Sequence, residues 1–321
     1  MEDCAKEESK KIIVIAGPTA TGKSAASIAV AKKFNGEIIS ADSAQIYRYM
    51  NIGTAKMTSI EMEGIPHHLI DIVDPDEPFS VSQYRNRADI CISEIFARGK
   101  IPIITGGTGL YINSILDSLE FTISAGDEDF RNRMEALADN KGNEYLHDML
   151  KKTDPEAAEK LHPNDVRRVI RALEVFETTG KKISEVQMES KNKPQRYECV
   201  FTAITDDRSV LYDRINKRVD TMLTKGLEYE VRLLLDMGFS DDLVSMQAIG
   251  YKEIVDSLKG RITREKMIDI LKMNSRRYAK RQLTWFRRDQ RVEWFDLSKF
   301  KTFDALTEKL IYYIAENLKI G

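Results

Sequence analysis

The chain contains few cysteines, no long apolar run and almost no net charge. Its 321 residues include three cysteines, Cys4, Cys91 and Cys199, which are scattered and show no paired spacing. This pattern argues against a disulfide framework and against a zinc site, and it fits a reducing compartment. No apolar run approaches the length of a membrane span, and the polar start MEDCAKEESKK lacks the apolar segment of a signal peptide. We therefore expect a cytoplasmic protein with no membrane partner.

The charges are distributed unevenly along the chain. Lys and Arg number 49 and Asp and Glu 51, so the net charge identifies no partner. From Arg261 to Arg291, however, eleven basic residues face three acidic ones. A basic segment on an otherwise acidic protein suits contact with nucleic acid, although an ordinary solvated helix face would look the same. The four histidines lack metal-ligand spacing, and we interpret His67 and His68 as structural.

Short apolar segments alternate with helical ones in the first third of the chain, a pattern that predicts a parallel sheet. We expect a helix at 24–34 and strands at 11–16, 37–41, 68–73, 101–105, 197–205 and 292–297. From about residue 127 to 190 the chain is charged and helical in pattern. The sequence therefore predicts an α/β core, residues 1–119 and 198–321, interrupted by a helical insertion at 120–197.

Residues 17–24, GPTATGKS, match the phosphate-loop pattern G-x-x-x-x-G-K-[ST] and lie between an expected strand and an expected helix. In that context backbone N–H groups converge on phosphate oxygens, and the helix N-terminus adds partial positive charge. Lys23 supplies a full charge, and the Ser24 hydroxyl can ligate Mg²⁺. The loop predicts that a di- or triphosphate binds, without deciding which; a plain glycine turn before a helix is the alternative.

Two expected strands end in residues with chemical potential. Asp42 follows the second strand, where it could ligate Mg²⁺, accept a proton or cap the next segment. The strand at 101–105 is followed by Gly106, Gly107 and Thr108, where an NTPase usually carries a metal-binding aspartate. This absence counts against simple ATP hydrolysis, although Asp71 or Asp74 could substitute.

Seven motifs together resemble the bacterial tRNA dimethylallyltransferases. In order from about residue 12 to 296 they are GPTATGKS, ADSAQIYRYMNIGTAK, PHHLIDIVDP, GGTGLY, HPNDVRRVIRALEVFETTGK, SMQAIGYKE and RRYAKRQLTWFRRD. The resemblance implies a P-loop NTPase-like core. It also implies transfer of a dimethylallyl group from its diphosphate to N6 of the adenosine immediately 3′ of the anticodon, with release of diphosphate. By resemblance we expect tRNAs that read codons beginning with U, and nothing requires more than a monomer.

The resemblance also assigns roles to residues of this chain. Asp42 matches the general base, Thr108 helps to position the adenosine, and Arg218 neutralises the departing diphosphate, with Arg214 a weaker neighbour. The diphosphate and Mg²⁺ would be held by Gly17, Thr19, Ala20, Thr21, Gly22, Lys23 and Ser24, with Ser24 the metal ligand. The anticodon stem-loop would contact Asp42, Ser43, Ala44, Gln45, Thr108, Arg131, Arg167, Arg168, Val169, Ile170, Arg171, Gln247, Ala248, Ile249, Gly250, Tyr251 and Lys252.

Two expected helices are suited to tRNA. In the helix at 165–179, apolar residues form one face, while Arg167, Arg168 and Arg171 lie opposite and Gly180 ends the helix. The helix at 264–288 carries basic residues four apart, which are adjacent along a helix: Arg276 with Lys280, and Arg277 with Arg281. Trp285 and Phe286 could stack on a base, but we expect core packing for at least one of them.

The sequence departs from the family pattern at three positions. Tyr49 stands where glycine is frequent, Asn51 where aspartate is, and Met57 where proline is; a glycine with positive φ at position 49 would imply a different local turn here. Three alternative functions stay open. An adenylate isopentenyltransferase would need neither the insertion nor the basic helix, a P-loop kinase or NTPase is favoured by the phosphate loop alone, and a noncatalytic RNA-binding module is favoured by the basic helices.

Overall fold

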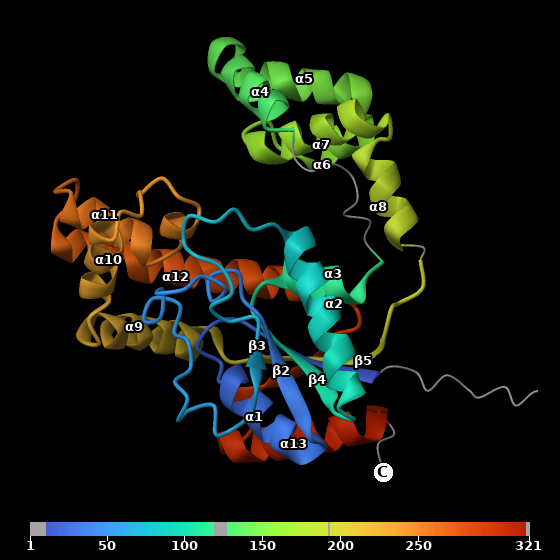
Figure 1. Cartoon of the computed structure of the whole chain (residues 1–321), viewed down its shortest axis with the longest axis vertical. Helices are drawn as coiled ribbons and strands as arrows, with labels where there is room; N and C mark the ends of the chain where they lie inside the picture. The colour runs from blue at the N-terminus through green and yellow to red at the C-terminus, as the bar shows by residue number, and fades with distance from the viewer. Residues whose placement is uncertain (1–10, 119–126, 192, 319–321) are drawn as a thin grey trace, which may run out of the picture. The chain divides into compact units, whose positions relative to one another are not determined.

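The computed structural model describes residues 11–118, 127–191 and 193–318. The chain divides into two compact units (Figure 1). Met1–Ile115 with Tyr197–Gly321 form an α/β unit, and Leu116–Arg196 form a helical unit. Among the described residues, no helix has the length and apolar character needed to cross a bilayer.

The α/β unit is built on a six-stranded sheet in which all neighbouring strands are parallel, in the order β3-β2-β4-β1-β5-β6. The strands are β1 (Lys11–Ala16), β2 (Gly36–Ala41), β3 (His67–His68), β4 (Ile101–Gly106), β5 (Glu198–Thr205) and β6 (Glu293–Asp296). This confirms the predicted parallel sheet. The strand expected at 68–73 is wrong beyond His68, because Leu69 and Asp71 adopt φ of 62° and 55°, outside the extended region.

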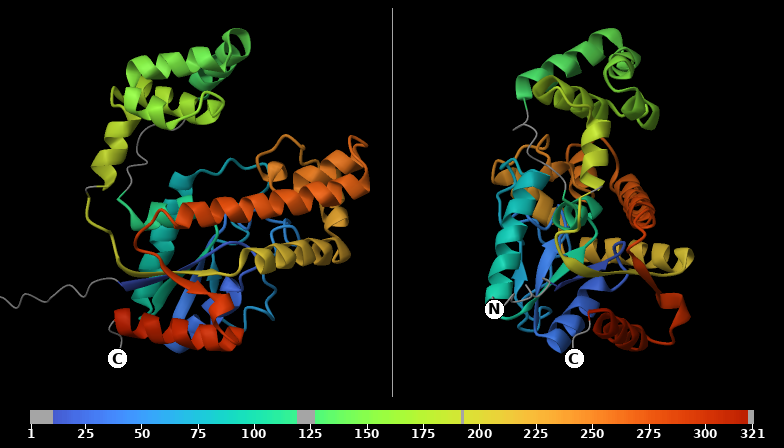
Figure 2. Two further views of the ribbon diagram at one scale, coloured as in Figure 1. Left: turned by 180° about the vertical axis from the view of Figure 1, so that it is seen from behind. Right: turned by 90° about the vertical axis from the view of Figure 1, so that its right-hand side faces the viewer.

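Helices cover both faces of the sheet (Figure 2). α1 (Lys23–Phe34) and α13 (Phe303–Leu318) pack on one face, and α2 (Val81–Ala97) and α3 (Gly109–Leu116) cover the other. Ile13 and Ile15 of β1 are fully buried in one apolar cluster with side chains of α1 and α13, and their neighbours Ile12 and Val14 are equally buried. A strand apolar on both faces is typical of a sheet covered on both sides.

The remaining helices of this unit belong to its carboxyl-terminal half and contribute residues beside the carboxyl ends of the strands. They are α9 (Arg208–Thr224), α10 (Leu227–Asp236), α11 (Tyr251–Leu258) and α12 (Arg264–Phe286), with the short turns η1 (Ser245–Gln247) and η2 (Leu297–Lys299). α9 and α12 lie side by side through Leu211, Ile215 and Ala279 (Figures 1 and 2). Phe286, near the end of α12, is fully buried and meets Phe201 of β5 edge to face at 6.2 Å, so it packs in the core as expected.

The helical unit has a separate apolar core. Its helices are α4 (Glu128–Lys141), α5 (Asn143–Thr153), α6 (Pro155–Lys160), α7 (Val166–Thr179) and α8 (Ile183–Lys191). The predicted helix before Gly180 is confirmed as α7, and Gly180 ends it with φ of 68°. Val169 and Ile170 are buried in the core of this unit. The side chains of these two residues are thus not available for the tRNA contact expected of them.

Candidate functional site

A pocket of about 340 Å³ lies at the carboxyl ends of β1, β2 and β4, where open α/β sheets bind their ligands. The phosphate loop, the segment after β2, η1 with the start of α11, and helices α9 and α12 all contribute to its wall. Of the predicted site residues it contains Thr19, Lys23, Ser24, Asp42, Ser43, Ala44, Gln45, Arg218, Gln247, Ala248, Ile249, Gly250 and Tyr251. Segments far apart in the sequence therefore meet within the α/β unit.

The phosphate loop is shaped by its own backbone. Gly17, Ala20 and Gly22 all have positive φ, and a Cβ on Gly17 would lie 2.4 Å from a carbonyl oxygen of β5, so only glycine fits there. The buried Thr21 hydroxyl donates to the Pro18 carbonyl at 2.9 Å. The Thr21 side chain thus stabilises the loop and does not line the pocket.

Two cations and one carboxylate face one another across this pocket. Burial and the neighbouring Arg218 guanidinium lower the pKa of Lys23 to about 8, against the opposing effect of Asp42. Burial likewise lowers the pKa of Arg218, again with Asp42 opposing. Arg214, expected as a weaker neighbour of Arg218, has a carboxylate partner of its own: its guanidinium lies 2.8 Å from Asp206. Lys23 and Arg218 are therefore cations with incomplete compensation, suited to an anionic ligand.

The side chain of Asp42 is oriented by its own turn. Its Oδ1 accepts the Ala44 N–H at 3.0 Å, while in the described part of the chain Oδ2 accepts no hydrogen bond. Thr108 lies beside it, because the Ser43 N–H donates to Thr108 Oγ1 at 3.0 Å and the Thr108 N–H to the Ala41 carbonyl. One carboxylate oxygen of Asp42 thus caps the segment that follows β2, which was one of the roles considered, and the other oxygen remains for chemistry.

Helix α12 contributes pocket residues that the sequence reasoning missed. Burial and the nearby Asp42 raise the pKa of Tyr278 to about 12, although the side chains of Thr108 and Gln282 oppose the rise. One turn further, the buried Gln282 accepts the Thr19 N–H at 3.2 Å and donates to the Gly107 carbonyl at 3.0 Å. Tyr278 and Gln282 are four residues apart, which places them on one face of the predicted helix. This was the available signal, but the basic residues around them suggested a tRNA-binding helix instead.

A buried carboxylate organises the opposite wall. Glu230 of α10 accepts the N–H groups of Asn51, Ile52 and Gly53 at 2.9, 2.7 and 3.1 Å, and the Tyr251 hydroxyl at 2.6 Å. The predicted tRNA residue Tyr251 is fully buried, so its hydroxyl supports this wall. Lys252, by contrast, is exposed on α11 outside the pocket.

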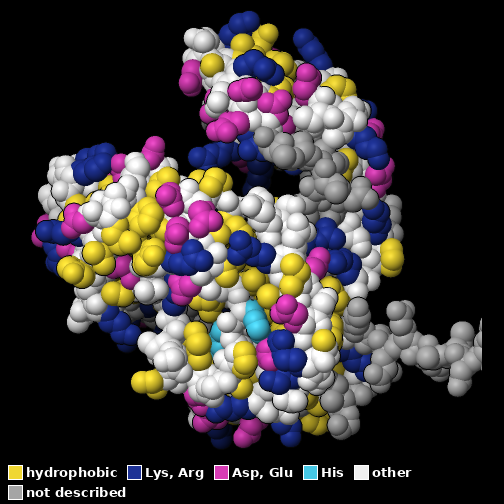
Figure 3. Space-filling model, in the orientation of Figure 1, with side chains coloured by type: hydrophobic (Ala, Val, Ile, Leu, Met, Phe, Trp, Pro, Cys, Tyr) yellow, Lys and Arg dark blue, Asp and Glu magenta, His cyan; other side chains and the backbone are white. Residues whose placement is uncertain are grey.

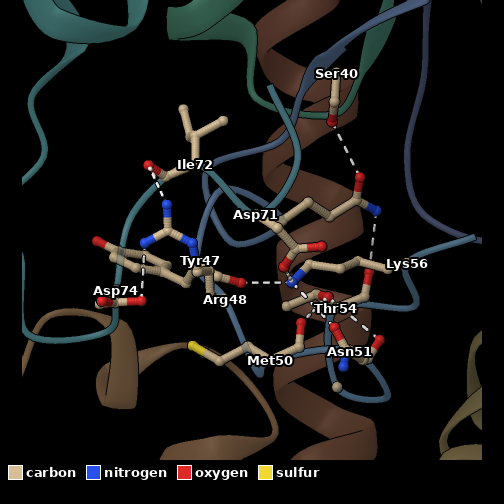
Figure 4. A network of polar contacts seen from close by, with 12 residues as sticks. Ser40, Tyr47, Arg48, Met50, Asn51, Thr54, Lys56, Asp71, Ile72 and Asp74 are labelled. Carbon is tan, nitrogen blue, oxygen red and sulfur yellow. Dashed lines mark hydrogen bonds and ion pairs between the residues drawn. The ribbon is translucent and has the colours of Figure 1, made fainter. Parts of the chain in front are cut away.

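Figure 4 shows the polar network that fixes the segment between β2 and β3. Lys56 Nζ contacts the Tyr47 carbonyl at 2.5 Å and Asp71 Oδ1 at 2.5 Å, and Arg48 Nη1 lies 2.9 Å from Asp74. Asp71 and Asp74 are thus held in ion pairs away from the pocket. They do not replace the missing metal-binding aspartate.

The pocket residues fit a hydrated divalent cation held chiefly by a ligand. Among the described residues, no three His, Cys, Asp or Glu side chains cluster as metal ligands, and Asp42 is the one carboxylate in the pocket wall. Mg²⁺ commonly keeps several waters and is completed by substrate phosphates. The Ser24 hydroxyl beside Lys23 could supply one further oxygen, as the sequence predicts.

The predicted tRNA arginines of the helical unit differ in their surroundings. The carboxylate of Glu174 is fully buried and accepts hydrogen bonds from the Arg131 guanidinium at 2.9 and 3.1 Å and from Arg171 at 2.5 Å. Arg168 lies 3.4 Å from Asp165, and Arg167 is exposed with no ion pair among the described residues. On the face shown in Figure 3, Lys and Arg side chains of this unit lie among Asp and Glu side chains.

The three departures from the family pattern have visible consequences. Tyr49 adopts φ of 67° and stacks on Phe239 at 6.3 Å, so a non-glycine residue takes the left-handed conformation here. Asn51 belongs to the wall that Glu230 organises, and Met57 lines the pocket. None of these positions disrupts the pocket.

The sequence analysis also made predictions for His67, His68 and Trp285. His68 is structural as expected, with Nε2 2.7 Å from Glu37, while His67 contacts the Ile65 carbonyl and also lines the pocket. Trp285 is partly exposed and packs against Gly109.

Comparison with known proteins gives consistent matches over nearly the whole chain. The family described as IPP transferase matches residues 45–289, and that described as isopentenyl transferase matches residues 10–73. The tRNA dimethylallyltransferase of Carboxydothermus hydrogenoformans is 54% identical over 303 residues, covering 94% of this chain and 97% of that protein. The tRNA dimethylallyltransferase of Bacillus cytotoxicus is 52% identical and covers 98% of each.

Solved structures agree with these matches. The tRNA isopentenylpyrophosphate transferase of Bacillus halodurans is 48% identical, with a TM-score of 0.74 and coverage of 97% of both chains. A eukaryotic dimethylallyltransferase acting on tRNA is 32% identical, with a TM-score of 0.83 over 97% of this chain and 80% of that one. These similarities extend through both units.

Proposed function

This chain belongs to the IPP transferase family, whose curated relatives are tRNA dimethylallyltransferases, and we propose that it prenylates adenosine in the anticodon loop. The donor is dimethylallyl diphosphate, and the acceptor is N6 of the adenosine immediately 3′ of the anticodon in tRNAs that read codons beginning with U. The observation that carries this proposal is the meeting of Asp42, Lys23 and Arg218 in one pocket.

The reaction needs a base and a cationic leaving-group site. As N6 attacks C1 of the prenyl group, the C1–O bond breaks and its electron pair leaves with the diphosphate. Asp42 accepts the N6 proton, which an amine conjugated with the purine ring does not release readily. Lys23 and Arg218 stabilise the negative charge that develops on the diphosphate.

The family generally uses a divalent cation, and we propose Mg²⁺ bound through Ser24 and the diphosphate. When bound, it would neutralise part of the diphosphate charge. Thr108, fixed beside Asp42 through Ser43, orients the adenosine.

The exposed arginines of the helical unit and the basic residues of α12 are proposed to bind the phosphates of the anticodon stem-loop. The unpaired loop makes extrusion of the target base inexpensive. We infer that a monomer suffices, because Lys23, Asp42 and Arg218 line one pocket within the α/β unit.

The test is transfer of label from dimethylallyl diphosphate to an unmodified anticodon stem-loop in the presence of Mg²⁺. A matched substrate with guanosine in place of the target adenosine serves as the control. Label in the adenosine RNA alone supports the proposal. Label on free AMP but not RNA would favour an adenylate isopentenyltransferase, and phosphate release from terminally labelled ATP without prenylation would favour an NTPase.

A further inference from the structure

Gln282 occupies an unusual position between two loops of the pocket. Its carboxamide bridges the phosphate loop, through the Thr19 N–H, and the loop after β4, through the Gly107 carbonyl. These partners lie 263 and 175 positions away in the sequence. The side chain is 5% exposed, so water competes little for either contact.

The orientation of this carboxamide is fixed by its partners. Thr19 offers a donor and Gly107 an acceptor, so Oε1 must face the phosphate loop and Nε2 must face Gly107. Rotating the amide by 180° would set two oxygens against each other and two N–H groups against each other. A Cβ at Gly107 would lie 2.0 Å from Nε2, so the absence of a side chain there permits this close approach.

The packing of α12 prevents Gln282 from moving aside. Four residues later on the same helix, Phe286 is fully buried against Phe201. Four residues earlier on the same helix, Tyr278 lines the same pocket, close enough to Thr108 and Gln282 for both to affect its pKa. The carboxamide oxygen is therefore a permanent part of the phosphate loop's surroundings.

We propose that Gln282 restricts the phosphate loop to a diphosphate by occupying the Thr19 amide. In phosphate loops the backbone N–H groups are the donors that hold phosphate oxygens. A further phosphate placed at Thr19 would meet the partial negative charge of Oε1, or would have to displace it and leave a buried acceptor unpaired. This deepens the proposed function, on which it rests, because a dimethylallyl donor carries two phosphates and ATP carries three.

The test measures anion affinity directly on the full-length chain. Pyrophosphate and tripolyphosphate are titrated by calorimetry in the presence of Mg²⁺, and the ratio of their dissociation constants is compared among variants. Gln282→Met keeps the side-chain volume but removes the acceptor, which frees the Thr19 N–H. One hydrogen bond to a charged group corresponds to about tenfold or more in affinity, so we expect the ratio to shift about tenfold toward tripolyphosphate.

Two variants separate selectivity from structural damage. Gln282→Glu retains an acceptor at Thr19 and should keep the preference for pyrophosphate, even where both anions bind more weakly. Gln290→Met makes the same change at an exposed glutamine that does not line the pocket, and it should leave the ratio unchanged. Circular dichroism establishes that each variant is folded.

An unchanged ratio in Gln282→Met, or an equal shift in Gln282→Glu, would overturn the inference. Because this binding assay contains no RNA and no prenyl donor, it is independent of transfer. A shifted ratio in a chain that fails to prenylate RNA would contradict the proposed function alone.

Discussion

The α/β unit and the helical unit surround their cations in opposite ways. In the helical unit, Arg131 and Arg171 share the buried carboxylate of Glu174, and these contacts lower the pKa of Glu174 although burial alone would raise it. In the α/β unit, burial dominates at Lys23 and Arg218 and lowers both pKa values, with Asp42 giving partial compensation.

This difference separates stabilising cations from ligand-binding ones. A cation already paired with a buried carboxylate gains little from a phosphate and loses its partner when it moves. A buried cation that lacks full compensation gains most when an anion arrives. We therefore expect substitutions in the helical unit to affect stability first, and substitutions in the pocket to affect the reaction first.

The largest effect is expected from Asp42→Ala. Removing a general base typically lowers turnover by about 10²–10⁴-fold, while all the expected tRNA contacts other than Asp42 are left intact. Steady-state kinetics should show the loss in kcat, and filter binding should show tRNA affinity nearly unchanged. Unchanged turnover would remove Asp42 from the proposed mechanism.

In the helical unit, Glu174→Ala should destabilise the fold by about 3 kcal/mol. The loss of a buried carboxylate that pairs with two arginines costs about 3–5 kcal/mol, and the lower value applies because both arginines remain partly exposed to water. Hydrogen exchange of the α7 amides measures the change. Glu177→Ala, an exposed change on the same helix, is the control, and equal effects of the two variants would contradict the role of Glu174.

The pH dependence of donor use sharpens the description of Lys23. Because its pKa is lowered to about 8, the ammonium loses its proton as the pH rises past that value. We expect kcat/KM for the diphosphate donor to fall as the pH rises above 8, approaching tenfold per pH unit. Lys23→Arg keeps its charge over this range, so an identical fall in that variant would assign the titration to another group.

The smallest effect is expected from Arg167→Ala. This exposed arginine is proposed to neutralise one phosphate, so its removal should weaken tRNA binding and reduce the slope of log K against log salt by about 1. Arg131→Ala should change the slope less, because Glu174 holds that guanidinium. Equal slopes for wild type and both variants would place the phosphate contacts elsewhere.

Motifs of neighbouring residues allowed much of the site to be predicted. The phosphate loop and Asp42 follow their strands directly, Thr108 lies two residues after β4, and parallel strands bring their carboxyl ends together. Gln282 could not be predicted in this way, because both its partners are remote in sequence and its helix is rich in basic residues. The role of Glu174 could not be predicted from neighbouring residues either, because its partner Arg131 belongs to another helix.

The wrong strand prediction has a related cause. The segment 68–73 contains apolar residues at strand-like positions, and its composition carries no sign of the left-handed residues Leu69 and Asp71. There the Asp71 N–H donates to the Gln45 carbonyl of the pocket wall. A local hydrophobic pattern cannot report a bond whose acceptor lies in another segment.

The carboxylate of Glu230 gives the wall formed by Asn51, Ile52 and Gly53 a property that matters for turnover. Three successive N–H groups converge on it as they would on a bound anion. A side chain of the protein thus takes the place that a bound anion would have in that turn. The turn is consequently ordered once, during folding, and does not have to be ordered again for each substrate molecule. Release of one product therefore leaves this part of the pocket wall in place, and the entropy of forming the turn does not enter the binding equilibrium.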